Sequence, residues 1–275
     1  MENKNVLKKL RKKILYISLI GKDGNIQSCF SSLEIIWTIY SFFLSVGRTE
    51  HFSEGRNRFV LSKGQSNLAV MVVLAEKGVI EERELEKFCK FDSRISMQAD
   101  RTKFSGIVET SAGSLGHGFP MAVGMAWAKK IKSEKGKIFC LAGDGEMNEG
   151  TMWEAAIFAS SEKLNNLVLI VDDNSSISRL IDIGSLKDKF IAFGFIVSEV
   201  NGHDVEALKE VLELNFDKPH VVLAKTIRGW GSKTLIEDRS WFHRYPKEDE
   251  IELLCREVDD FEKDYARMCK KIYFK

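Results

Sequence analysis

The sequence lacks a charge excess, a long apolar run and a low-complexity linker. Its 41 Lys and Arg residues nearly balance its 40 Asp and Glu residues, which leaves a net charge of +1. This balance argues against a nucleic-acid coat protein and against an acidic tail. The longest apolar stretch, IIWTIYSFFLSV, has 12 residues and is too short to cross a bilayer. Because the N-terminal region also has no signal-peptide pattern, we expect a cytoplasmic protein that binds neither nucleic acid nor membrane.

Cysteine and proline are also sparse. The chain has three prolines and five cysteines, and the cysteines share no spacing typical of metal ligands (Cys29, Cys89, Cys140, Cys255 and Cys269). We therefore expect reduced thiols in the core or on the surface. Hydrophobic residues make up 44% of the chain, which is ample for a core. We predict a single domain over 1–275, with a helical N-terminal segment and a helical extension from about residue 246.

Helical and strand patterns alternate along the chain. Apolar residues at helical spacing predict helices over 5–20, 31–45, 66–78, 81–91, 117–132, 149–164, 186–194 and 205–214. Apolar runs predict strands over 58–62, 137–143, 166–174, 195–202 and 220–227. The second helix would begin with Ser31 or Ser32 as its cap. Runs of Val, Ile and Leu between helices are typical of a parallel sheet covered on both faces. This predicts a doubly wound α/β fold with a mainly parallel sheet flanked by helices, and ligands beyond the carboxyl ends of the strands.

One such strand end carries an unusual acidic, glycine-rich stretch, LAGDGEMNEG at 141–150. An ordinary turn, a phosphate cradle and a metal-diphosphate site are the three interpretations. The glycine spacing fits neither the dinucleotide-binding fingerprint nor the P-loop. Asp144 between two glycines suits a hard cation that itself holds phosphates, since Mg²⁺ takes few protein oxygens. The next strand ends in Asp173 and Asn174, and Asn174 lies 30 residues beyond Asp144. In a parallel sheet this spacing returns the chain to the same edge, one strand over.

GDG followed by Asn at this distance resembles the thiamine-diphosphate signature of the transketolase family, in its N-terminal, diphosphate-binding half. The resemblance extends from about residue 8 to 250 and includes the stretches RFVLSKG, TSAGSLGHG, VDDN, VNGHD, AKTIRGWG and WFHRYP. It implies the thiamine-diphosphate-binding fold of the diphosphate type, with thiamine diphosphate and Mg²⁺ as cofactors. The enzyme class it implies is a thiamine-diphosphate-dependent transferase of the transketolase type.

The resemblance also implies residues that bind the cofactor and metal. Asp144, Asn174 and the backbone carbonyl of Ser176 would ligate Mg²⁺. Gly143 and Gly145 would let the backbone approach the diphosphate. The loop of Gly113, Ser114, Leu115 and Gly116 would contact the aminopyrimidine ring.

Two further residues would act near the reaction itself. Glu149 resembles the family carboxylate at the dimer interface, which communicates with a glutamate of the partner. His243 matches the family histidine near the diphosphate and the reacting centre. Both are therefore candidate catalytic and cofactor-binding residues. His203 in VNGHD is expected only to cap or order a loop.

The sequence departs from the family at three positions around the substrate. Gln65 and Gln98 stand where the family has histidine, and Asn25 is the equivalent of a third. Gln and Asn keep hydrogen-bonding capacity but do not titrate near neutral pH. Cofactor attachment therefore looks intact, while substrate handling looks altered.

The chain also departs from a full transketolase in length. The pyrimidine-binding domain, with the glutamate that activates the cofactor, would follow residue 275. We expect a C-terminal subunit to supply it, in an α2β2 heterotetramer that is active only when assembled. The leading hypothesis is transfer of a two-carbon ketol unit from a ketose to an aldehyde or modified-sugar acceptor. The alternatives are acyl transfer to a sugar from a 2-oxoacid such as pyruvate, and a catalytically inactive scaffold half.

Overall fold

Within the described residues, one parallel sheet of five strands forms the centre of the fold. The computed structural model describes residues 2–45, 54–111, 113–176 and 181–261. Its strands are β1 (Arg58–Leu61), β2 (Ile138–Gly143), β3 (Leu167–Asp173), β4 (Ile196–Asn201) and β5 (His220–Lys225). They are arranged in the order β1-β2-β3-β5-β4. Gly143 pairs with Asp172 and Asp172 with Ala224, so these three neighbouring strands end at one edge.

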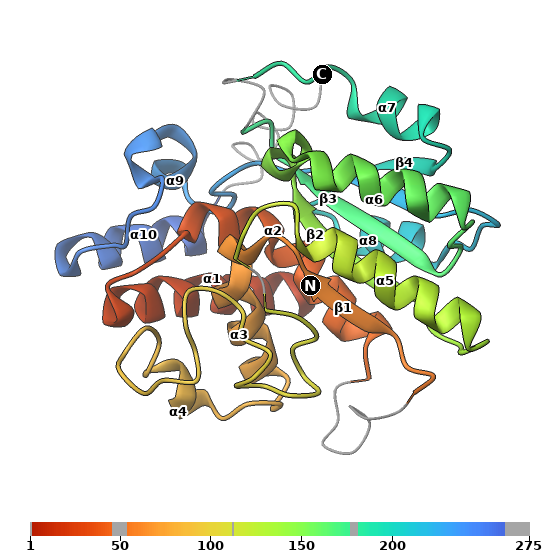
Figure 1. The fold of residues 1–275 in the computed structure, drawn as a ribbon. Coiled ribbons are helices and arrows are strands. Elements are labelled where there is room, and N and C mark those ends of the chain that lie inside the picture. Colours follow the sequence, from red (N-terminus) through yellow and green to blue (C-terminus); the bar gives the residue numbers. More distant parts are fainter. Residues whose placement is uncertain (1, 46–53, 112, 177–180, 262–275) are drawn as a thin grey trace.

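Helices cover both faces of this sheet (Figure 1). Apolar side chains of α1 (Glu2–Gly21), α2 (Ile26–Thr38), α3 (Asn67–Glu76) and α8 (Val205–Glu213) form one core with Phe139 and Leu141 of β2. The alternate residues Ile138 and Cys140 join a second core with α5 (Gly118–Ile131), α6 (Gly150–Ser161) and α7 (Leu186–Ala192). Since successive residues of a strand point to opposite faces, both faces of β2 are buried. The predicted doubly wound fold is confirmed.

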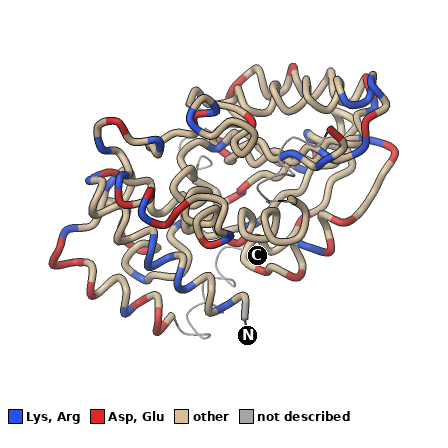
Figure 2. Tube along the Cα trace, turned by 90° about the horizontal axis from the view of Figure 1, so that it is seen from below, with Lys and Arg blue, Asp and Glu red and all other residues tan. Residues whose placement is uncertain are grey.

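Short elements and one long helix complete the described part of the chain. They are η1 (Ile39–Phe43), η3 (Gly64–Ser66), α4 (Glu82–Leu85), η4 (Asp144–Asn148), α9 (Lys233–Glu237), η5 (Arg239–Trp241) and α10 (Glu248–Asp260). Helix α10 packs beside α1. Basic and acidic residues are interspersed along the chain (Figure 2). Within the described residues, the helices are all too short or too polar to cross a bilayer.

The start of α2 differs from the sequence prediction. The helix begins at Ile26 with Asn25 as its N-cap, so Ser31 and Ser32 lie inside it. Their hydroxyls donate to the carbonyl of Ser28, at 3.0 and 2.9 Å. Oδ2 of Asp172, 2.7 Å from the Ser31 hydroxyl, is an alternative acceptor for its one hydrogen. Serine in a helix interior is tolerated because its hydroxyl bonds back to an earlier carbonyl, so these serines are not caps.

The predicted helix over 81–91 is also wrong, because only Glu82–Leu85 are helical. Cys89 and Asp92 have φ angles of 55° and 60°, which no right-handed helix contains. The amide of Cys89 donates to the carbonyl of Ile95 at 3.0 Å and so closes a turn.

Candidate active site

A cavity of about 210 Å³ opens at the carboxyl ends of the strands. Seven separate segments contribute to it: the start of α2, the residues after β1, the loop before α5, the GDGE stretch at the end of β2, the residues after β3, the loop after β5, and the residue after η5. The lining residues are Asn25, Ser28, Lys63, Gln65, Leu115, Gly143, Asp144, Gly145, Glu146, Asn174, Ser176, Arg228 and Phe242. This is the place where a parallel sheet of this kind binds its ligands.

Asp144 and Asn174 meet at one backbone amide. The amide of Ser176 donates to Oδ2 of Asp144 at 2.7 Å and to Oδ1 of Asn174 at 3.1 Å. The hydroxyl of Ser176 donates to Oδ1 of Asp144 at 2.8 Å. Ser175, with a φ of 57°, turns the chain back after β3 and makes this approach possible. A carboxylate oxygen and an amide oxygen therefore face the same point.

This oxygen pair suits a hard divalent cation. In the described part of the chain, no group of three or more His, Cys, Asp or Glu side chains gathers as a metal site. Mg²⁺ does not need such a group, because it is usually held by one or two side-chain oxygens together with phosphates and water. Zn²⁺ would need more nitrogen or sulfur ligands than these residues offer.

The two cations of the cavity differ in their partners. Lys63 forms a buried ion pair with Asp172. Burial raises the pKa of Asp172, but Lys63 and hydrogen bonds from Lys63, Thr226 and Ser31 outweigh it and hold this pKa below its usual value. The charge of Lys63 is thus compensated inside the protein.

Arg228 is the other cation of the cavity. Its guanidinium lies 4.4 Å from the centre of the Phe242 ring. Its Nε atom is buried and has no hydrogen-bond partner among the described residues. Burial lowers the pKa of Arg228, and the carboxylates of Asp144 and Asp172 partly oppose this. An arginine stays charged despite such a decrease. Arg228 and Lys63 were not singled out from the sequence, where each is one basic residue in a loop.

Glu146 ties three segments of the site together. Its Oε1 accepts from the hydroxyl of Ser62 at 2.5 Å and from the amide of Gly116 at 3.0 Å. Its Oε2 accepts from the amide of Gly143 at 2.9 Å. Burial raises the pKa of Glu146, and these hydrogen bonds oppose the increase. Glu146 was not predicted from the sequence, although a glutamate three residues after a helix cap is a known signal for such a bond.

Comparison with known proteins decides the family. Residues 21–264 match the sequence profile of the family described as "Transketolase, thiamine diphosphate binding domain". The chain belongs to the transketolase family. It is thereby placed among the thiamine-diphosphate-dependent transferases, as the sequence analysis predicted.

Relatives of two lengths match the chain. An apulose-4-phosphate transketolase subunit of Actinobacillus succinogenes is 35% identical, over 92% of this chain and 94% of the relative. The protein of the same name from Phocaeicola vulgatus is 32% identical, over 92% of each. The solved transketolase of Campylobacter jejuni has a TM-score of 0.80 at 26% identity, over 93% of this chain and 42% of its own. The chain therefore spans less than half the length of that transketolase.

The cavity brings together most of the residues that the transketolase resemblance named. Asn25, Gln65, Leu115, Gly143, Asp144, Gly145, Asn174 and Ser176 line it. Gly113 and Ser114 are exposed, Gly116 is buried and donates its amide to Glu146, and none of these three residues lines the cavity. Residues far apart in the sequence thus lie around one cavity, while the roles that the resemblance implies for them stay predictions.

Three further named residues do not line the cavity either. His243 is exposed, and its neighbour Phe242 lines the cavity instead. Gln98 is half-buried, and its Oε1 has no hydrogen-bond partner within the described residues. Glu149 is the N-cap residue of α6 and packs against the loop at Gly116. The roles predicted for these three residues stay predictions.

Proposed function

We propose that this chain is the diphosphate-binding subunit of a two-component, thiamine-diphosphate-dependent transketolase-like enzyme. The observation that carries the proposal is the single cavity shared by Asp144, Asn174 and Arg228. Thiamine diphosphate supplies a carbon nucleophile that also stabilises the carbanion formed from a substrate. The chain's own residues bind and orient it: Asp144, Asn174 and the carbonyl of Ser176 hold Mg²⁺, and the open backbone at Gly143 and Gly145 approaches the phosphates.

Charge balance supports this assignment. A diphosphate brings more negative charge than one Mg²⁺ neutralises, and Asp144 adds another. A cation is therefore needed at the same end of the cavity. Lys63 is already paired with Asp172, so Arg228 is the residue we assign to the diphosphate.

The substrate end of the cavity supports ketol transfer with an altered substrate. Asn25 and Gln65 line the same cavity as the proposed metal ligands. They can hold hydroxyl groups by hydrogen bonds but do not shuttle protons. The reaction we propose moves a two-carbon ketol unit from a ketose donor to an aldehyde or modified-sugar acceptor. Two relatives are named for apulose 4-phosphate, which makes that compound the first donor to assay.

The same two residues favour a second candidate, acyl transfer to a sugar from a 2-oxoacid such as pyruvate. That route removes no proton from a ketose hydroxyl, so it does not need the family histidines. A catalytically inactive scaffold half is less well supported, because Asp144 and Asn174 still meet at one amide.

An apolar surface supports a second component of the enzyme. Helices α5 and α6 lie side by side on one face of the sheet (Figure 1). Their exposed side chains include Trp127, Ile131, Ile157 and Phe158, and the rings of Trp127 and Phe158 touch edge to face. Exposed apolar patches of this kind mark interaction sites. We assign this surface to contacts in an α2β2 assembly with a C-terminal subunit that carries the activating glutamate. The names of the two relatives, each of which is one subunit of its enzyme, support such an assembly.

The test is co-expression with a candidate C-terminal subunit, followed by assays with thiamine diphosphate and Mg²⁺. Ketol transfer from apulose 4-phosphate or another ketose phosphate supports the proposal, whereas carbon dioxide release from pyruvate favours the second candidate. Asp144→Ala should weaken Mg²⁺-dependent cofactor binding, measured by calorimetry, by more than about tenfold. Asp173→Asn is the matched control, because Asp173 pairs with Lys225 and is not a proposed ligand. Equal binding by Asp144→Ala and wild type would contradict the metal assignment.

A further inference from the structure

The loop after β5, which presents Arg228 to the cavity, is anchored on both sides of that residue. Before it, the hydroxyl of Thr226 donates to Asp172, and the amide of Ile227 donates to Nε2 of His203 at 2.8 Å. After it, the amide of Gly229 donates to the carbonyl of Gln27 at 3.2 Å, and Nε of Arg11 donates to the carbonyl of Trp230 at 2.8 Å. The backbone on each side of Arg228 is thus held by residues from α1, α2, β3 and the loop before α8.

His203 occupies the centre of these anchors. Its Nε2 accepts the Ile227 amide, so Nε2 carries no proton and Nδ1 must carry one. Nδ1 therefore donates to Oε2 of Glu34, at 3.3 Å. Burial lowers the pKa of His203, although Glu34 opposes the change. The imidazole is neutral, its tautomer is fixed by these two contacts, and the Trp230 ring stacks on it at 4.3 Å.

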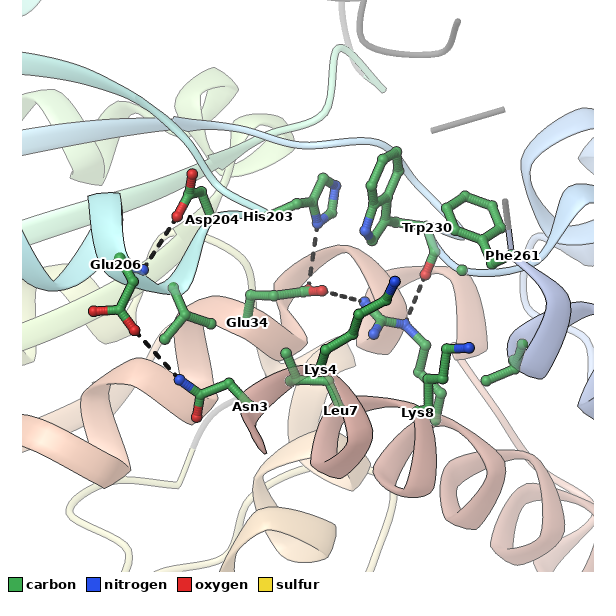
Figure 3. Close-up of a pocket in the computed structure, with 14 residues that line it drawn as sticks. Asn3, Lys4, Leu7, Lys8, Glu34, His203, Asp204, Glu206, Trp230 and Phe261 are labelled. Atoms are coloured by element: carbon green, nitrogen blue, oxygen red, sulfur yellow. Dashed lines mark hydrogen bonds and ion pairs between the residues drawn. The ribbon is translucent and has the colours of Figure 1, made fainter. Parts of the chain in front are cut away.

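Glu34, which Figure 3 shows beside His203, joins this histidine to Arg11 in a buried network. Oε1 of Glu34 accepts from Nη2 of Arg11 at 2.6 Å. Burial raises the pKa of Glu34, but Arg11 and His203 outweigh it and hold this pKa below its usual value, so Glu34 is ionised. The three side chains line a second cavity, of about 400 Å³, and none of them lines the first.

Such a network is a poor means of stabilising a fold. Burying an ion pair costs solvation energy that well-packed apolar residues would not cost. The best-attested use of buried polar groups is to specify one arrangement of the chain. Here the network specifies the arrangement of the loop at 226–231. The amide of Ile227 in this loop is held by His203, and an apolar residue at position 203 would leave this amide without an acceptor.

We propose that His203 and Glu34 are positioning residues, which hold the loop at 226–231 so that Arg228 faces the diphosphate. The inference rests on the proposed function, since it concerns the same cavity. Neither residue lines the cavity that contains Asp144 and Arg228. They affect cofactor binding only by positioning Arg228. This dependence on Arg228 distinguishes a positioning role from a general contribution to stability.

A double-mutant cycle tests this on the complex with the co-expressed C-terminal subunit. The probe is Mg²⁺ with inorganic pyrophosphate, and the readout is the dissociation constant from calorimetry. Arg228→Met should weaken binding by about tenfold or more, and His203→Leu by a similar factor. In the Arg228→Met background, His203→Leu should add less than about threefold, because the group that it positions is gone. His203→Gln keeps one acceptor and one donor and should bind within about threefold of wild type.

The cycle separates the possible failures. Equal losses from His203→Leu in both backgrounds would show a merely structural role and overturn the inference. If Arg228→Met alone binds normally while Asp144→Ala does not, Arg228 is not a diphosphate ligand and the inference falls with it. If the wild-type complex does not bind the probe, the proposed function itself is contradicted. If His203→Leu does not fold, Glu34→Gln replaces it, since it removes the charge while keeping the packing.

Discussion

His220 provides a quantitative test of how the sheet is buried. It begins β5, is 2% exposed, and its Nε2 lies 2.9 Å from the hydroxyl of Ser198 on β4. Burial, and then the charge of Lys137, lower the pKa of His220 from 6.5 to about 4. This difference (2.5 × 1.36) corresponds to about 3.4 kcal/mol of unfolding free energy. Because the folded pKa is depressed, the contribution is complete above pH 6.5 and is lost as the pH falls through 4.

The assay is urea unfolding followed by tryptophan fluorescence, at about pH 7.5 and about pH 4.5. His220→Gln keeps a hydrogen-bonding side chain but does not titrate, so other groups cancel in the difference between the two proteins. Between these pH values, wild type should lose about 2.5 kcal/mol more than His220→Gln. Parallel losses would refute the reasoning, because they would mean that His220 is hydrated enough to protonate in the folded state.

Two further predictions concern the loop around Gly116. Folding raises the pKa of Glu146, so the contribution of Glu146 to stability is complete below pH 4.5 and is lost as the pH rises through the folded pKa. The unfolding free energy of wild type, measured by urea titration relative to that of Glu146→Gln, should therefore fall with rising pH. Gly116→Ala should cost about 1–3 kcal/mol in the same measurement. Gly116 has a φ of 76°, and an added Cβ would lie 2.5 Å from that of Glu149. Gly113→Ala, which meets nothing within 4 Å, is its matched control and should be neutral.

The sequence predicted the fold, and the proximity of Asp144 to Asn174, for a simple geometric reason. Parallel strands that follow one another through helices end at one edge, so side chains just after β2 and β3 must meet. Asp144 and Asn174 do so at the amide of Ser176. The proximity of Asn25 and Gln65 to this cavity was predicted instead from the family resemblance. The spacing of apolar residues does not predict that the start of α2 lies near the end of β1.

The remainder depended on contacts that local pattern does not encode. Ser31 looks like a helix cap in the sequence, but its hydroxyl lies within hydrogen-bond distance of Asp172, 141 residues away. Lys63 and Arg228 look equivalent as loop cations. In the structure, Lys63 forms a buried ion pair with Asp172, whereas the Nε atom of Arg228 has no hydrogen-bond partner among the described residues. Such differences arise from tertiary packing, which decides whether a buried charge is paired with another group of the protein.

The interactions made by the ionisable side chains of the cavity indicate which groups could transfer protons in the reaction. Among the described residues that line the cavity, each acidic or lysine side chain is already engaged: Asp144 by Ser176, Glu146 by three donors, and Lys63 by Asp172. Asn25 and Gln65, at the proposed substrate end, do not titrate. A transferase needs a general acid or base within hydrogen-bond reach of its substrate. We therefore expect the proton-transferring groups to come from the C-terminal subunit, in which case mixing the separately purified components should restore activity that neither shows alone.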